Sequence, residues 1–182
     1  TEESFKQLSG QSITLLHVAT HGFYSPLTGH YTAQRSFEEQ ALSRSGLFLS
    51  GAAASLNMKK IPEDIEDGIL TAKELSKLDL SNLNLAILSA CQTGLGEIVG
   101  DGVFGLQRGF KKAGAQTLLM SLWKVDDTAT QLLMAEFYKN LVSGQNKRAA
   151  FLNAQKYLRS YQNGIYDKPE YWAAFIMLDG IH

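Results

Sequence analysis

The sequence has a single cysteine among its 182 residues, Cys91. One thiol excludes an intramolecular disulfide framework and any metal site built from several thiolates. The 17 Lys and Arg residues nearly balance the 18 Asp and Glu residues, which gives a net charge of -1 and a pI near 6.4. Such a balance lacks the basic surface that nucleic acid or anionic lipid requires, so we expect neither as a partner.

Long apolar runs are also missing. No stretch approaches the roughly 20 residues that a membrane span needs, and no basic segment followed by an apolar one opens the sequence as a signal peptide. We therefore expect a cytoplasmic protein with no membrane partner. The chain begins with Thr1 rather than Met, and we expect it to be a piece of a longer protein. Its length and 45% hydrophobic content are typical of one globular domain, residues 1–182.

The hydrophobic pattern alternates between strands and helices. The predicted strands are apolar nearly throughout and cover 12–20, 45–52, 83–91, 116–123 and 171–178. The predicted helices cover 70–78, 103–113, 127–142 and 147–161. This order indicates an α/β fold with a mostly parallel central sheet flanked by helices on both faces. We expect the strands ending at Thr20, Ala90 and Trp123 to be central, and the strand ending at Leu178 to lie near one edge.

Two of these strands end in reactive residues. The first delivers His21, followed by Gly22, and the second delivers Cys91. Because the carboxyl ends of parallel strands meet at one edge of a sheet, we expect His21 and Cys91 to lie side by side as base and nucleophile. The backbone N–H groups of Gly22 and Cys91 would form an oxyanion hole. The alternative is that Cys91 is a buried small hydrophobic residue with no catalytic role.

His17 competes with His21 for the role of base. It lies on the same strand face by parity, but about 13 Å back along a strand that rises ~3.3 Å per residue. That position favours a core histidine with satisfied hydrogen bonds. The glycine-rich stretch from Gly94 to Gly102 lacks both the GxGxxG order and a Walker Lys-Ser/Thr pair, so nucleotide binding is disfavoured. Asp126 or Asp127 caps the following helix, or else faces a substrate pocket.

Together the segments LLHVATHG, LSACQTGLGE and SLWKVDD resemble the CHAT domain, a caspase-like module often found after tetratricopeptide repeats in bacterial proteins. The segments SGLFLSGA, DGILTAKELSKL and DGVFGLQRGFKKAGA extend the resemblance over nearly the whole chain. It implies a caspase-like three-layer fold and a relationship to caspases, separases and gingipains. It also implies a cysteine endopeptidase that needs no cofactor, cleaves a protein or peptide, and follows an N-terminal repeat region.

Carried over residue by residue, the family's catalytic pair falls on His21 and Cys91, and its oxyanion glycine falls on Gly22. Caspases carry a Gln two positions before the nucleophile to help read an aspartate. Ser89 stands there instead, so we do not expect aspartate specificity. In separase-like relatives an acidic residue near the segment matching SLWKVDD reads a basic residue, a role that Asp126 or Asp127 would take.

The pocket for the residue before the cut is expected between Ser89 and the segment from Trp123 to Asp127. Trp123 would form an apolar wall of this pocket. The alternative to a peptidase is a non-catalytic CHAT scaffold, in which the polar stretches 23–44 and 53–68 bind a partner protein.

Overall fold

A four-stranded sheet forms the middle layer of the molecule. The computed structural model describes residues 1–25, 37–56, 66–89, 97–99 and 102–180. The strand order is β1 (Leu15–Val18), β5 (Leu85–Leu88), β8 (Thr117–Ser121) and β9 (Phe175–Asp179). β1, β5 and β8 are parallel, whereas β9 pairs antiparallel with β8. The sheet is therefore mostly parallel, as the sequence predicts.

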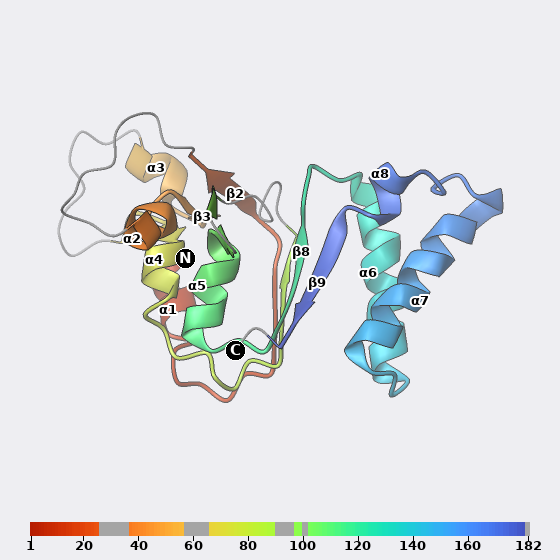
Figure 1. Cartoon of the computed structure of the whole chain (residues 1–182), viewed down its shortest axis with the longest axis horizontal. Coiled ribbons are helices and arrows are strands. Elements are labelled where there is room, and N and C mark those ends of the chain that lie inside the picture. The colour runs from red at the N-terminus through yellow and green to blue at the C-terminus, as the bar shows by residue number, and fades with distance from the viewer. Residues whose placement is uncertain (26–36, 57–65, 90–96, 100–101, 181–182) are drawn as a thin grey trace.

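The helices cover this sheet on two sides, which makes a three-layer arrangement (Figure 1). One side carries α1 (Glu2–Lys6), α4 (Ala72–Leu75) and α5 (Leu106–Ala113), and the other carries α6 (Asp127–Val142), α7 (Lys147–Ser160) and α8 (Pro169–Trp172). Because side chains alternate across a strand, Leu88 packs on the α5 side and Ile87 on the α6 side. Each apolar strand thus contributes to two cores.

A second, antiparallel sheet lies beside the first. It consists of β2 (His21–Tyr24), β3 (Ser45–Phe48) and β4 (Ile69–Thr71), with β3 in the middle. The remaining elements are α2 (Phe37–Leu42), α3 (Ala52–Leu56), the 3₁₀ turn η1 (Tyr161–Asn163), and the hairpin of β6 (Glu97–Val99) and β7 (Gly102–Phe104). No helix among the described residues is long and apolar enough to cross a membrane.

Local sequence signals explain where several helices begin and end. Thr71 and Glu74 form the predicted capping box of α4, in which each side chain bonds the other's backbone N–H. Asp126 caps α6, with its Oδ1 accepting from the N–H of Ala129 at 2.8 Å. Gly114 ends α5 in the left-handed conformation, at φ 96°.

The structure corrects the predicted position of the first strand. The pattern predicts one central strand over 12–20, but β1 covers only Leu15–Val18 and lies at an edge of the four-stranded sheet. The apolar pattern in the sequence extends past Val18, the end of β1. After β1 the chain continues directly into β2 of the second sheet. Periodicity cannot distinguish one long strand from two short strands that belong to different sheets.

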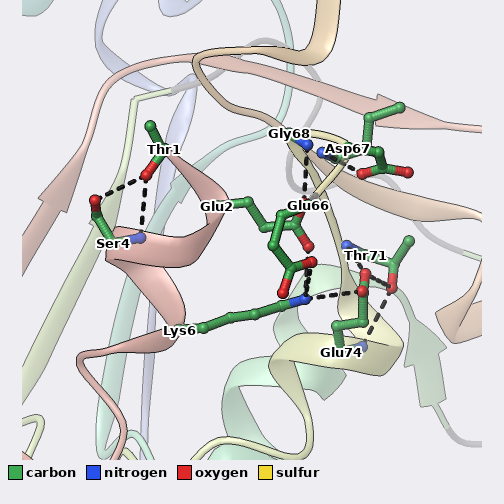
Figure 2. A network of polar contacts seen from close by, with 10 residues as sticks. Thr1, Glu2, Ser4, Lys6, Glu66, Asp67, Gly68, Thr71 and Glu74 are labelled. Atoms are coloured by element: carbon green, nitrogen blue, oxygen red, sulfur yellow. Dashed lines mark hydrogen bonds and ion pairs between the residues drawn. The ribbon is translucent and has the colours of Figure 1, made fainter. Parts of the chain in front are cut away.

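The N-terminal helix α1 is held to the fold by a cluster of charges around Lys6. The Lys6 Nζ lies 2.7 Å from Glu2, 2.7 Å from Glu66 and 3.1 Å from Glu74. Glu2 is almost completely buried and also accepts a hydrogen bond from the Gly68 N–H at 2.9 Å. Figure 2 shows the Lys6 side chain reaching from α1 toward these carboxylates. We call Lys6, Glu2, Glu66 and Glu74 the Lys6 cluster.

Candidate active site

His21 lies where the two sheets meet. It is the first residue of β2 and pairs with Phe48 of β3, and the preceding Thr20 hydroxyl donates a hydrogen bond to the Phe48 carbonyl. The sequence predicts His21 at the end of the first strand, but that strand ends at Val18. Gly22 follows His21 in β2 and pairs with Leu47. The backbone around His21 is thus fixed by the second sheet.

A cavity of about 280 Å³ brings together several predicted site residues. His21, Ser89 and Asp127 all line it, and the other described residues of the lining are Ala19, Thr20, Lys124, Val125 and Thr130. Ser89 directly follows β5, and its N–H donates to the Val18 carbonyl at 3.0 Å. The cavity therefore lies at the carboxyl ends of β1 and β5 and beside the N-terminus of α6. This is the edge of a parallel sheet where sites form.

Cys91, the predicted nucleophile, lies outside the described residues, two positions after Ser89. The pairing of His21 with Cys91 therefore stays a prediction, and so does the oxyanion role of the Cys91 N–H. Ser89 is the last described residue before Cys91, and it lines the same cavity as His21.

The two neighbouring aspartates take different positions. Asp126 is occupied as the N-cap of α6, whereas Asp127 lines the cavity. Trp123 is not part of the cavity lining, and its indole N–H donates to the Glu170 carbonyl of α8 at 3.1 Å. Lys124 lines the cavity together with Asp127 and lies within the predicted wall segment 123–127, although the sequence does not single it out. A lysine in a loop before a helix gives no signal that would reveal this.

His17 uses both ring nitrogens in hydrogen bonds. Its Nε2 lies 2.9 Å from the Ser89 Oγ, and its Nδ1 lies 2.7 Å from the Tyr138 hydroxyl of α6. The ring is exposed at the sheet edge and is therefore not a core residue, although its hydrogen bonds are satisfied as expected. Burial of part of the ring lowers the pKa of His17, which favours the neutral imidazole at pH 7. Nothing in the sequence indicates the contact with Tyr138, which lies 121 positions away.

A second cavity, of about 640 Å³, also reaches His21. Its lining is mainly apolar and comprises Thr20, His21, Phe48, Leu49, Ser50, Ala52, Ala53 and Leu56. His21 thus borders two cavities, and of their described lining residues only those of the first include Asp127 and Lys124. A histidine in this position can contact a molecule that occupies either space.

The Lys6 cluster contains three carboxylates whose oxygens lie within 4.8 Å of one another. Such a group could bind a cation, but the Lys6 ammonium already contacts all three (Figure 2). Partial burial alone would lower the pKa of Lys6, but its hydrogen bonds to the carboxylates outweigh burial and raise it. Lys6 therefore stays charged and takes the place of a metal ion.

The three layers, the mostly parallel sheet and the histidine at its carboxyl edge define a caspase-like α/β protein. The chain belongs to the CHAT domain family, whose model matches residues 1–180. This family is related to the caspase-like peptidases.

Two curated relatives are similar to part of the chain. Tetratricopeptide repeat protein 28 of Mus musculus is 34% identical over 110 residues, which is 60% of this chain and 4% of that protein. Its Homo sapiens counterpart is 32% identical over 114 residues, which is 63% of this chain and 4% of that protein. The chain is thus similar to only a small part of each relative.

Proposed function

We propose that this chain is a cysteine endopeptidase that uses His21 as the base and Cys91 as the nucleophile. The observation that carries the proposal is the shared cavity, because residues from β2, from the end of β5 and from the start of α6 all line it. Membership of a peptidase-related family supports the same function. Cys91, two positions after Ser89 in the sequence, would give the site its reactive thiol.

The proposed reaction has two stages. His21 takes the proton of the Cys91 thiol, and the thiolate attacks the carbonyl carbon of the scissile peptide bond. The N–H groups of Gly22 and Cys91 stabilise the negative oxygen that results. The C–N bond then breaks, His21 returns its proton to the leaving amine, and a thioester remains on Cys91. Water, activated by His21, hydrolyses the thioester and releases the acid.

The cavity beside His21 is the proposed subsite for the residue that precedes the cut. Asp127 contributes a carboxylate and Ser89 a hydroxyl, and these groups would bind the side chain of Arg or Lys. Lys124 lines the same cavity, and its positive charge would repel another cation there. With Asp126 engaged as a helix cap, Asp127 is the acidic residue that would determine this preference.

The proposed partners are a protein or peptide substrate and a repeat region elsewhere in the same protein. The name of the mouse and human relatives supports the second partner, because it describes tetratricopeptide repeats. That name mentions no reaction, which keeps a second candidate function open. In this alternative the chain is a non-catalytic interaction module.

Cleavage of a peptide library, with and without the dyad, tests the function. We expect Cys91→Ala and His21→Ala each to abolish cleavage with the fold intact, because the two groups act as one unit. His17→Ala is the matched histidine control, and it should still cleave peptides of the library even where its preference for Arg and Lys is weaker. Wild-type turnover by His21→Ala would refute the assignment of the base. No cleavage by any form of the protein would favour the interaction module.

The same library tests the subsite. We expect Asp127→Asn to reduce the preference for Arg and Lys by about tenfold, since it removes one charge-assisted hydrogen bond. Lys124→Met should increase that preference, and Asp126→Asn should leave it unchanged. A basic preference that survives Asp127→Asn would show that another group reads the side chain.

A further inference from the structure

A chain of hydrogen bonds connects helix α6 to the cavity through an edge strand. The Tyr138 hydroxyl lies 2.7 Å from the His17 Nδ1, and the His17 Nε2 lies 2.9 Å from the Ser89 Oγ. Ser89 in turn lines the cavity with Asp127. The three residues come from α6, from β1 and from the end of β5, so the contact depends on the tertiary fold. We call them the Tyr138–His17–Ser89 chain.

A neutral imidazole allows two arrangements of the protons in this chain. In the first, the Ser89 hydroxyl donates to Nε2 and the Nδ1–H donates to Tyr138. Both lone pairs of the Ser89 oxygen then remain as acceptors. In the second, Tyr138 donates to Nδ1 and the Nε2–H donates to Ser89. The Ser89 hydrogen is then left for another acceptor, and only one lone pair remains.

The position of the Ser89 proton decides which ligand the cavity favours. A guanidinium or ammonium group offers only donors, so it needs acceptors around it. The first arrangement supplies two lone pairs at Ser89 in addition to the Asp127 carboxylate. The second presents a hydrogen to the ligand's own hydrogens, which is unfavourable. A cation in the cavity would therefore select the first arrangement.

We propose that His17 and Tyr138 are specificity-determining positioning residues, which hold the Ser89 hydroxyl as an acceptor for a basic side chain in the cavity. The inference rests on the proposed function in treating this cavity as the subsite for the residue before the cut. It takes over the proposed preference for a basic side chain and adds two residues that determine it without lining the cavity themselves.

Protonation of His17 removes the first arrangement. An imidazolium donates from both nitrogens, so its Nε2–H must point to Ser89 and its Nδ1–H to Tyr138. Among the described residues, the other titratable groups on the cavity are His21, Asp127 and Lys124, and Tyr138 contacts the far side of the His17 ring. Binding of a cation should therefore weaken as the pH falls through the pKa of His17. By linkage, a bound cation should lower the pKa of His17 further.

Binding of a small cation tests the proposal without any cleavage. The probes are n-butylguanidinium and its neutral analogue n-butylurea, titrated into the Cys91→Ala chain. Nitrogen NMR of the His17 ring reports its tautomer and pKa in the same samples. We expect the guanidinium to bind more tightly, to enrich the Nδ1–H tautomer and to lower the pKa of His17. We expect the urea to do none of these.

Variants then separate positioning from structural support. Ser89→Ala should weaken n-butylguanidinium by about tenfold and leave n-butylurea unchanged, as expected for a hydrogen bond to a charged group. His17→Phe should cause a smaller loss and reduce the pH dependence of binding below 7, and Tyr138→Phe should shift the tautomer ratio. The matched controls are Leu15→Ala, on the same face of β1, and Tyr157→Phe, an exposed tyrosine of α7.

Several results would overturn the proposal. Equal affinities for the two probes would show that the cavity does not select a cation. An Nε2–H tautomer in the n-butylguanidinium complex would contradict the proton arrangement. Equal losses of n-butylguanidinium affinity in His17→Phe and Leu15→Ala would show that His17 has only a structural role. If the cation binds as expected but the wild-type chain cleaves nothing, the proposed peptidase function fails and this inference stands.

Discussion

The Lys6 cluster and the Tyr138–His17–Ser89 chain are two polar networks that belong to opposite faces of the central sheet. In the Lys6 cluster one ammonium contacts three carboxylates, and the Glu2 and Glu74 carboxylates also bond the backbone N–H groups of Gly68 and Thr71. The Tyr138–His17–Ser89 chain contains only groups that are neutral at pH 7, and one end of it lines a cavity.

The difference separates a network that stabilises the fold from one that can recognise a ligand. The groups of the Lys6 cluster already have partners of opposite charge, so a ligand would have to displace Lys6. Among the described residues the Ser89 hydroxyl has one hydrogen-bond partner, His17, and it can still bond a molecule in the cavity. Changes to the first network should therefore affect stability, and changes to the second should affect specificity.

The largest expected effect on stability comes from Lys6→Met. It leaves the buried Glu2 carboxylate without its cation, and we expect a loss of about 2 kcal/mol in the free energy of unfolding. This is below the roughly 3–5 kcal/mol for a fully buried pair, because Lys6 and Glu66 reach solvent. Urea denaturation measures this loss.

The control is Lys139→Met, which removes the pair that the exposed Lys139 forms with Glu136 and should cost less than about 0.5 kcal/mol. Equal losses in the two variants would contradict the structural role of the Lys6 cluster.

A smaller loss is expected from the cap of α6. Asp126→Ala removes the bond to the Ala129 N–H and should cost about 1 kcal/mol. Asp127→Asn leaves this bond in place and should cost much less, while it changes the ligand preference of the cavity. Thermal melts of both variants measure the loss of stability, and their affinities for the two probes measure the ligand preference. If only Asp126→Ala changed the ligand preference of the cavity, Asp126 rather than Asp127 would be the residue that determines it.

The pH dependence of stability should distinguish two carboxylates of the Lys6 cluster. Burial alone would raise the pKa of Glu74, but hydrogen bonds from Thr71 and Lys6 outweigh burial and lower it below the ordinary value of 4.5. Its contribution is complete above pH 4.5 and is lost as the pH falls through the lowered pKa. Burial raises the pKa of Glu2, so Glu2 costs stability as the pH rises above 4.5.

Denaturation curves from pH 3 to 7 should therefore change in opposite ways in the two variants. Glu74→Gln should flatten the fall in stability below pH 4.5. Glu2→Gln should remove a loss that begins above pH 4.5. The same change of slope in both variants would contradict the assigned directions.

The smallest expected effect on stability is at His17. Because its pKa is lowered by burial, the neutral ring favours the folded state, and this contribution is lost as the pH falls below the ordinary value of 6.5. His17→Gln should weaken this dependence and change stability at pH 7 only slightly, since the residue is only partly buried. A large loss at pH 7 would show that His17 supports the fold rather than the cavity.

The sequence predicts the elements whose signals are local. The apolar runs of β5 and β8, the capping box at Thr71 and the start of α6 at Asp127 all match the structure. The hairpin of β6 and β7 was missed because its glycine-rich sequence is typical of a loop. The sequence also does not predict that His21 belongs to a second sheet, because the apolar pattern of a strand does not show which other strands it pairs with.

The candidate site shows the same limit. Strand ends predict that His21 and Cys91 lie side by side, and this pairing stays a prediction because Cys91 lies outside the described residues. His21 and Ser89, two positions before Cys91, line one cavity. The choice between Asp126 and Asp127 could not be made from the sequence, because either residue suits a helix N-terminus. The contact of Tyr138 with His17 depends on how α6 packs against an edge strand, and residues 121 positions apart share no local signal.

The central claim is that Cys91 is a nucleophile activated by His21, and the pH dependence of its alkylation tests this most directly. Iodoacetamide should label Cys91 in the folded chain at a rate that stays high below the usual thiol pKa of about 8.5. In His21→Ala the rate should fall and follow an ordinary thiol, whereas His17→Ala should behave like the wild type. A wild-type profile in His21→Ala, or no labelling of folded wild-type protein, would contradict the account.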